Sequence, residues 1–225
     1  FDTHILEPLK KKSKADRRIH FICESLFDIK KQLTTVGAGM HVVQGDPTEK
    51  IPQLAAQLGV DRVYYNRDYS PYSLTRDSQV NQTLTQRNIH VETFQDHVLV
   101  EPSAVVKADG TPYQVFTPYS KAWKAYCSQN PSTLTPYSCK LSHISNDTQP
   151  SFNTISDLLS IAGFEHAPPF LTGGRTAGKA TLETFKPWLS SYDENRNFPS
   201  LDRTSHLSVY LRHGCVSPRE LVALA

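Results

Sequence analysis

The interpretation of this chain depends on Tyr192-Asp-Glu-Asn-Arg-Asn-Phe-Pro199, which is followed after four residues by Thr204-Ser-His-Leu-Ser208. Hydroxyl side chains dominate the second segment, and such side chains are favoured at helix N-caps and in first helical turns. The free N–H groups at the start of a helix also attract anions. The stretch therefore predicts an extended segment before a proline, followed by a hydroxyl-rich helix entry with the character of a phosphate site.

The residues that follow predict two short helices separated by a tight break. Leu207, Tyr210 and Leu211 have the apolar spacing of one helical face, and Gly214 ends that helix. Ser217-Pro218 then caps and begins another helix. Between positions 196 and 219, positive charge exceeds negative charge by three. The only acidic residue in this range is Asp202, and the basic residues are Arg196, Arg203, Arg212 and Arg219. A solvated helical hairpin with good caps is the simplest interpretation of these features.

The order of these residues resembles the photolyase/cryptochrome family of flavoproteins. The pattern consists of Tyr, Arg-x-Phe-Pro, Thr-Ser-x-Leu-Ser and Tyr-Leu-Arg-x-Gly-x-x-Ser-Pro-Arg. In that family the segment opens the helical domain that binds FAD. The resemblance implies that Tyr192 contacts the flavin and that Arg196 contacts the DNA backbone. It also implies that the FAD phosphates are wrapped by Thr204, Ser205, His206, Leu207 and Ser208.

Composition is that of an ordinary globular chain. The 225 residues are 38% hydrophobic and 20% charged, with a net charge of +2. Such a balance neither requires nor excludes nucleic acid, so a DNA surface would have to come from local clustering. The four cysteines lack C-x-x-C spacing and indicate reduced thiols of a cytoplasmic protein. No apolar run approaches the length of a membrane span. We also expect the protein to be a monomer.

The first hundred residues alternate between helical and strand patterns. Helices are predicted from about Asp16 with Ile19, Ile22, Leu26, Ile29 and Leu33 inward; from Pro47 with Ile51, Leu54 and Leu58 inward; and over 73–86 with Val80 and Leu84 inward. Residues 1–5 are predicted to be the tail of a strand, and further strands are predicted at 40–43, 60–65, 89–94 and 98–100. Single helices between strands indicate βαβ units and a doubly wound, Rossmann-like parallel sheet in an α/β domain.

Two further stretches carry the family resemblance. Gly110-Thr-Pro-Tyr-Gln-Val-Phe-Thr-Pro-Tyr119 predicts an aromatic corner and a helix capped at Thr117-Pro118, and it resembles a structural corner of the family. Asn66-Arg-Asp-Tyr-Ser-Pro-Tyr72 follows a strand, where ligands of such sheets gather, or forms a plain Asp-stabilised turn. It resembles the antenna-domain loop, which implies a second chromophore, either a folate or a deazaflavin. Ser70 and Tyr72-Ser73 replace the acidic residue and Asn-Glu pair of folate-type members, so the chromophore type stays open.

Pattern and resemblance together predict three segments. Residues 1–125 form the antenna domain, residues 126–172 form an interdomain linker with a helical patch at 155–161, and residues 173–225 begin the helical FAD-binding domain. Both ends read as interior positions, because residue 1 is not Met and the last helical pattern has no cap. We therefore expect a piece of a longer protein, with an earlier strand missing and the catalytic residues lying beyond Ala225.

Other chemistry has weak support. Gly173-Gly-Arg-Thr-Ala-Gly-Lys-Ala180 nearly matches a P-loop, but Ala180 replaces the Mg²⁺-binding hydroxyl and no buried strand precedes it. We expect these glycines to start a helix that carries Ala180, Leu182, Phe185, Trp188 and Leu189. The histidines form no metal-binding pair, so no metal is expected. We expect His213 to have a surface or packing role.

The resemblance implies a light-dependent DNA repair enzyme that acts on UV-damaged DNA. In the family, reduced FAD absorbs light and donates an electron that splits a cyclobutane pyrimidine dimer. The fragment alone is expected to be inactive. A cryptochrome-like blue-light photoreceptor without repair activity is the alternative, and a non-flavin nucleotide-binding α/β protein leaves residues 192–219 unexplained.

Overall fold

The computed structural model describes residues 1–138, 144 and 152–224. The chain divides into two compact units, one formed by residues 1–59 with 139–216 and the other by residues 60–138 with 217–225. Each unit combines segments that are distant in the sequence. This grouping reflects contacts within the chain, and the boundaries at 125 and 172 stay predictions.

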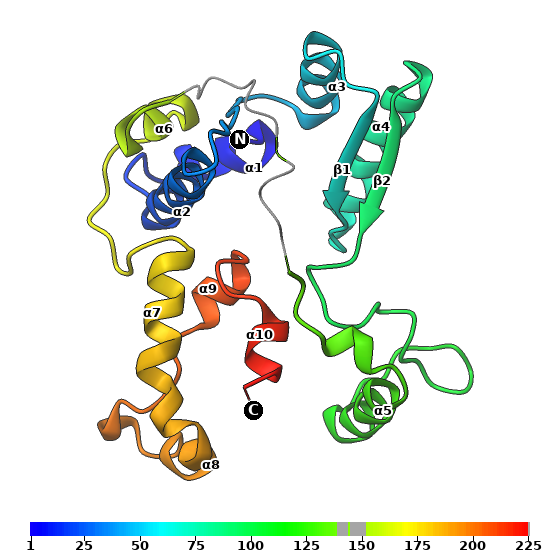
Figure 1. Ribbon diagram of the computed structural model, residues 1–225, viewed down its shortest axis with the longest axis vertical. Coiled ribbons are helices and arrows are strands. Elements are labelled where there is room, and N and C mark those ends of the chain that lie inside the picture. Colours follow the sequence, from blue (N-terminus) through cyan, green and yellow to red (C-terminus); the bar gives the residue numbers. More distant parts are fainter. Residues whose placement is uncertain (139–143, 145–151, 225) are drawn as a thin grey trace. The chain divides into compact units, whose positions relative to one another are not determined.

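The first unit is helical within its described residues (Figure 1). Its elements are α1 (Thr3–Lys10), α2 (Arg17–Thr34), α3 (Pro47–Gln57), α6 (Ile155–Ala162), α7 (Arg175–Phe185), η3 (Lys186–Ser191), α8 (Tyr192–Asn195), η4 (Pro199–Leu201) and α9 (Ser208–Arg212). The core joins α1, α2 and α6 through buried apolar side chains: Leu6, Ile19, Cys23, Phe152, Leu158, Leu159, Ala162 and Phe164. Burial raises the pKa of the Cys23 thiol to about 12, so it is a packing group at neutral pH.

Helix starts in this unit follow from local capping. Asp16 caps α2 and Asp46 caps α3, each accepting a hydrogen bond from the backbone N–H two residues later. Thr154 and Asp157 form a capping box at the start of α6, which confirms the helical patch predicted at 155–161. Residues 139–143 and 145–151 of the predicted linker lie outside the described residues.

The second unit contains a parallel sheet of two strands with a crossover helix (Figure 1). Its elements are β1 (Arg62–Asn66), α4 (Pro71–Gln86), β2 (His90–Phe94), α5 (Phe116–Gln129), η1 (Pro131–Leu134) and α10 (Pro218–Val222). The strand register pairs Arg62 with His90 and Asn66 with Phe94. Val80 and Leu84 are buried on α4, so the predicted βαβ unit and its inward face are confirmed.

Several strand predictions are wrong. Thr3–Lys10 is helical because Asp2 caps it through the His4 N–H, and only a single bridge joins Asp2 to Gly45. Residues 40–43 are not a strand. Residues 98–100 form a bend, in which the Gln95 amide donates to two backbone carbonyls and Val100 turns into an apolar cluster with Val105 and Cys127.

Some predicted inward faces are also wrong. On α3, Ile51 and Leu58 are exposed while Pro52 and Ala55 are buried, and on α2 Ile29 is exposed. Apolar spacing locates a stripe, but the packing partner decides which edge of the stripe is covered. The predicted cap at Thr117 is wrong as well, because α5 begins at Phe116 after Val115, without a side-chain cap.

Leu84 and Leu74 provide a matched test of the sheet unit, since both lie on α4. Leu84 is 0% exposed and Leu74 is 56% exposed. We expect Leu84→Ala to lower the free energy of unfolding by about 2–5 kcal/mol, because it leaves a cavity. Leu74→Ala should change it by no more than about 0.5 kcal/mol. Urea unfolding followed by circular dichroism measures both, and equal effects would contradict this packing.

Candidate cofactor and DNA-binding site

The segment predicted to bind phosphates is a structured loop ahead of a short helix. Leu207 is buried and anchors the loop, while Thr204, His206 and Ser208 are exposed. The predicted capping is wrong in detail. Helix α9 begins at Ser208, its N-cap is Leu207, and no side chain caps it. The hydroxyls of Thr204 and Ser208 therefore do not cap α9.

The loop backbone adopts two left-handed conformations in residues other than glycine. Asp202 has φ 44° and His206 has φ 50°. An Asp202 carboxylate oxygen lies 2.7 Å from His206 Nε2, so the pair bridges the loop. Backbone strain of this kind persists only where surrounding contacts hold it, and it is common at functional sites.

Aromatic rings and guanidinium groups flank this loop. Arg203 lies over the Trp188 ring, with Cζ 4.1 Å from the centroid. Tyr192 packs edge-on against Phe185 with centroids 5.7 Å apart, and Arg196 extends over the Tyr192 ring at 6.0 Å. Arg196 is exposed. The predicted flavin contact and the predicted DNA contact are therefore neighbours in the structure, as they are in the sequence.

One of the four arginines serves another purpose. Arg219 is 2% exposed, its Nη1 donates to Asp96 at 2.6 Å and its Nε donates to the Thr133 carbonyl at 3.2 Å. Its guanidinium also lies over the Tyr137 ring at 4.5 Å. Because this arginine is paired inside the second unit, the positive surplus inferred from the sequence does not extend to position 219.

The near-match to a P-loop is explained by two carboxylates on α2. Gly173 N–H donates to Glu24 at 2.6 Å, and both the N–H and the hydroxyl of Thr176 donate to Asp28, at 3.1 and 2.8 Å. The start of α7 is therefore filled by the chain's own anions. A Cβ at Gly173 would lie 2.3 Å from the Phe21 carbonyl oxygen, so this glycine permits close packing. The predicted helix start is confirmed, and α7 carries Ala180, Leu182 and Phe185. The prediction that the same helix carries Trp188 and Leu189 is wrong, because α7 ends at Phe185 and these two residues lie in η3.

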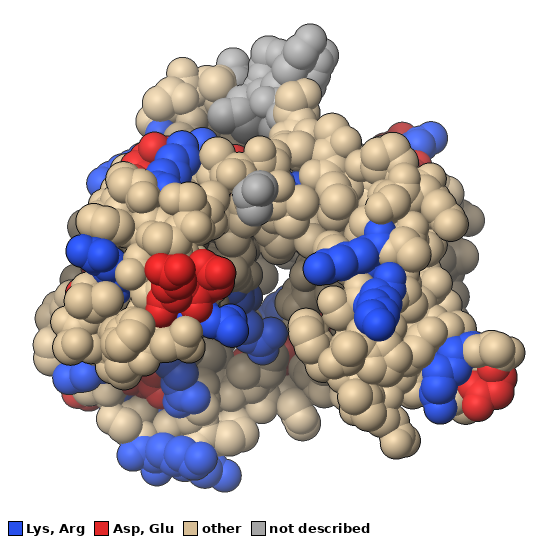
Figure 2. Space-filling view, turned by 90° about the horizontal axis from the view of Figure 1, so that it is seen from below, with Lys and Arg blue, Asp and Glu red and all other residues tan. Residues whose placement is uncertain are grey.

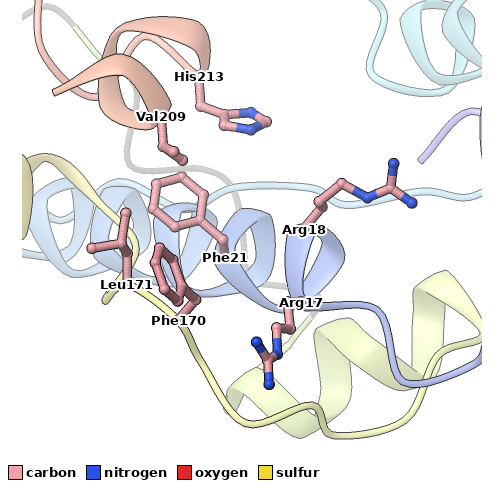
Figure 3. Close-up of a pocket in the computed structure, with 7 residues that line it drawn as sticks. All are labelled: Arg17, Arg18, Phe21, Phe170, Leu171, Val209 and His213. Atoms are coloured by element: carbon pink, nitrogen blue, oxygen red, sulfur yellow. The ribbon is translucent and has the colours of Figure 1, made fainter. Parts of the chain in front are cut away.

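A second feature of the helical unit, the Phe21 pocket, was missed by sequence reasoning. It has a volume of about 270 Å³ and is lined by Arg17, Arg18, Phe21, Phe170, Leu171, Val209 and His213. Figure 3 shows the Phe21 ring between Val209 and the Phe170–Leu171 pair, with Arg17 and Arg18 extending from the start of α2. Residues so far apart in sequence give no joint pattern.

In the sheet unit, a pocket lies at the carboxyl ends of both strands. It has a volume of about 400 Å³ and is lined by Asn66, Phe94, Gln95, Asp96 and Tyr137. This is the edge where ligands bind in parallel α/β sheets. Asp96 and Tyr137 are both held by Arg219, which fixes one wall.

The loop after β1 is a hydrogen-bonded turn. Burial acts to raise the pKa of Asp68, but hydrogen bonds from the Ser73 hydroxyl and from the N–H groups of the two following residues outweigh it, and the pKa lies below its usual value. Arg67 pairs with Glu101 at 2.5 Å, and the Tyr69 hydroxyl donates to the other Glu101 oxygen at 2.9 Å. The Asp-stabilised turn expected from the sequence is confirmed.

Within residues 1–138, 144 and 152–224, no three His, Cys, Asp or Glu side chains are grouped as metal ligands. No helix among those residues is both long and apolar enough to span a bilayer. Cys23, Cys127 and Cys215 are free and buried, and Cys139 lies outside the described residues.

Known proteins match this chain along most of its length. A family model described as DNA photolyase matches residues 2–137, more than half of the chain. The chain belongs to the DNA photolyase family. This confirms the resemblance seen in the sequence, although the matched range ends before the predicted FAD segment.

Individual members extend the match. A deoxyribodipyrimidine photo-lyase of Synechococcus is 32% identical over 212 residues, covering 92% of this chain and 43% of that protein. A cryptochrome DASH of Gloeobacter violaceus is 29% identical over 208 residues, covering 90% of this chain and 41% of that protein. The crystal structure of a class III photolyase from Agrobacterium tumefaciens superposes with a TM-score of 0.77 at 25% identity, covering 94% and 44%. The chain therefore spans less than half the length of these photolyase-family proteins.

The carboxylates of α2 can be tested by substitution. We expect Asp28→Ala to lower the free energy of unfolding by about 1–2 kcal/mol, because Thr176 loses its acceptor at the start of α7. Glu183→Ala is the matched control, since Glu183 is exposed and forms a surface ion pair with Lys186. Thermal unfolding measures both changes, and an Asp28 variant as stable as the control would show that the cap is dispensable.

His213 gives a pH dependence. Burial, and then the charge of Arg212, lower the pKa of His213 below its usual 6.5. Below pH 6.5 the unfolded chain therefore takes up a proton that the folded chain resists, so this residue makes stability fall as the pH falls. We expect His213→Asn to reduce the loss of stability between pH 7 and pH 5, measured by urea unfolding at each pH. Parallel curves for the variant and the parent chain would refute the expectation.

Proposed function

We propose that the protein containing this chain is a light-dependent DNA repair flavoprotein that splits cyclobutane pyrimidine dimers, with FAD as its cofactor. The observation that carries the proposal is the loop 202–208, which presents hydroxyls beside guanidinium groups in a chain of the DNA photolyase family. Because the chain spans 43% of its photo-lyase relative, the activity is proposed for the whole protein.

The residues present suit the phosphates of FAD. Thr204 and Ser208 hold exposed hydroxyls on a loop that buried Leu207 fixes in place, with Ser205 and His206 between them. Ser205 accepts a long hydrogen bond of 3.4 Å from the Leu207 N–H and so supports the loop. Tyr192 contributes an accessible ring for the flavin side. When bound and reduced, FAD supplies the photoexcited electron that the repair reaction needs.

Arg196 is the proposed contact to the DNA backbone. Its guanidinium extends from the end of α8 next to the Tyr192 ring and is exposed, so a phosphate can reach it. Repair of a dimer inside a duplex requires its extrusion, which costs less at a damaged site. Arg196, which lies next to the Tyr192 ring on the proposed flavin side, would hold the backbone of the DNA strand from which the dimer is extruded.

A second chromophore is proposed at the carboxyl ends of β1 and β2. The pocket there has aromatic walls at Phe94 and Tyr137 and polar groups at Asn66, Gln95 and Asp96. That mixture suits a heterocyclic ring with hydrogen-bonding edges. Both a folate and a deazaflavin have this character, and the residues of the pocket do not choose between them.

A cryptochrome-like photoreceptor is the second candidate. The similarity to a cryptochrome DASH favours it, because this relative covers nearly as much of the chain as the photo-lyase does. Both candidates share the flavin loop and differ in whether irradiated DNA is repaired. For either one we propose a monomer that acts in the cytoplasm, supported by the three buried free thiols.

The loop can be tested by flavin binding and repair. In the full-length gene product, we expect Thr204→Val with Ser208→Ala to weaken FAD binding about tenfold or more, because two hydroxyl contacts to phosphate are lost. Thr184→Val is the control, since Thr184 is exposed on α7 and its hydroxyl donates to the Ala180 carbonyl of the same helix. Flavin fluorescence during FAD titration measures the affinity.

Repair is then assayed under blue light on an oligonucleotide that contains one cyclobutane dimer. Loss of the dimer in the light, with none in the dark, supports the repair enzyme. Flavin binding without repair supports the photoreceptor. A full-length protein without flavin absorption would overturn both proposals.

A further inference from the structure

The connection between α1 and α2 carries a concentrated positive charge. Residues 10–18 contain six Lys or Arg side chains and one carboxylate, Asp16. Lys10 pairs with Glu7 at 2.8 Å, and Arg18 pairs with Asp16 at 2.5 Å. The remaining four cations are exposed and have no ion pair among the described residues; they are Lys11, Lys12, Lys14 and Arg17. We call residues 11–17 the basic connection.

Charge is otherwise spread over the molecule. On the face drawn in Figure 2, Lys and Arg side chains form several separate groups, with acidic groups between some of them. The net charge is only +2. A polyanion would therefore find no uniformly basic surface and would depend on local clusters.

The basic connection leads directly into the Phe21 pocket. The Lys14 carbonyl accepts a hydrogen bond from the Glu165 N–H at 2.9 Å. This bond holds the basic connection against the segment that continues to Phe170. Arg17 lines the pocket together with Phe21 and Phe170 (Figure 3). The Phe170 ring is 79% exposed and follows two prolines, whose fixed φ angles limit its mobility. Arg17 thus adjoins an accessible aromatic ring, and the other three unpaired cations lie in the segment of chain that leads to it.

We propose that the basic connection and the Phe21 pocket together form a contact for single-stranded nucleic acid. The cations meet the phosphates, and Phe170 stacks on one unpaired base at the mouth of the pocket. A cationic track beside aromatic rings is the arrangement by which proteins bind single strands without reading their sequence. A solvated charged loop would account for the lysines but not for the exposed ring next to them.

The pocket volume suits an unpaired base better than a dinucleotide. Its 270 Å³ lies just below the range of about 300–1,000 Å³ typical of sites for drug-sized ligands, so it suits a single base rather than a whole dinucleotide. Bases in a duplex stack on each other and do not offer a face to Phe170. Of the nearby carboxylates, Asp16 is paired with Arg18 and Glu7 with Lys10, so both charges are offset, while Glu165 is exposed on the same segment.

The contact requires neither FAD nor a lesion, so it is independent of the proposed repair function. The test uses the 225-residue chain without flavin, in the dark, with an undamaged fluorescein-labelled oligothymidine of 12 nucleotides. Fluorescence anisotropy gives the affinity, and a duplex of the same length serves as the competing substrate. We expect the single strand to bind at least tenfold more tightly than the duplex.

The aromatic part is tested with two exposed phenylalanines. We expect Phe170→Ala to weaken binding of the single strand about tenfold, because one stacking contact is lost. Phe116→Ala is the matched control, since the Phe116 ring is 77% exposed on α5 in the other unit. It should leave the affinity unchanged. Both variants remove exposed side chains, and circular dichroism verifies that they fold.

The charged part is tested with two lysine pairs. Replacing Lys11 and Lys12 by Gln should reduce the magnitude of the slope of log affinity against log salt by about 1.4. Each phosphate contact to a single strand contributes about 0.7 to that slope, and two contacts are lost. Replacing Lys121 and Lys124 by Gln makes the same charge change on the exposed side of α5 and should leave the slope unchanged.

Equal losses for Phe170→Ala and Phe116→Ala would overturn the proposal, and so would equal slopes for the two lysine pairs. Duplex binding as tight as single-strand binding would overturn it too, because the cations would then act without an unpaired base. Weakening by Phe170→Ala, together with a smaller slope for Lys11 and Lys12 alone, establishes the contact.

Discussion

The helical unit depends on the pairing of two α2 carboxylates with the start of α7. Glu24 and Asp28 lie one turn apart on α2 and accept hydrogen bonds from Gly173 and Thr176. The free N–H groups at a helix start need acceptors, and a partly buried carboxylate needs donors, so each side satisfies the other. The loop that joins α6 to α7 thereby acquires a fixed end.

The position of the candidate cofactor loop follows from that joint. The Tyr210 hydroxyl donates to the Thr172 carbonyl at 2.9 Å, next to the glycine that Glu24 binds. Gly178 on α7 allows Tyr210 and Val216 to approach so closely that a Cβ there would lie 2.8 Å from a Val216 methyl. These contacts hold α9 and the loop before it against α7, and the carboxylates of α2 hold the start of α7. A loop of hydroxyls that must meet phosphates needs such a rigid support.

Sequence patterns predicted the features whose causes are local. The start of α2 near Asp16, the helical patch of α6, the capped start of α10, the stop at Gly214 and the βαβ unit around α4 depend on neighbouring residues. Features that depend on distant partners were not predictable in the same way. Nothing in residues 20–30 shows that their carboxylates will cap a helix 150 residues later, and nothing near Arg219 indicates Asp96. The family resemblance supplied the cofactor segment, while the Phe21 pocket, built from α2, residues 170–171 and α9, had no signal in the sequence.

The arginines show why a count of charges does not locate an anion site. Arg219 is buried against Asp96, Arg18 is held by Asp16 in front of its own helix, and Arg203 lies flat on Trp188. A guanidinium already paired with a carboxylate would have to give up that charge-assisted hydrogen bond, worth about 1.5–3 kcal/mol, before it could bind a phosphate. Arg17 and Arg196 have no such pair among the described residues and are exposed. Of these five arginines, Arg17 at the start of α2 and Arg196 at the end of α8 are therefore the ones open to a phosphate.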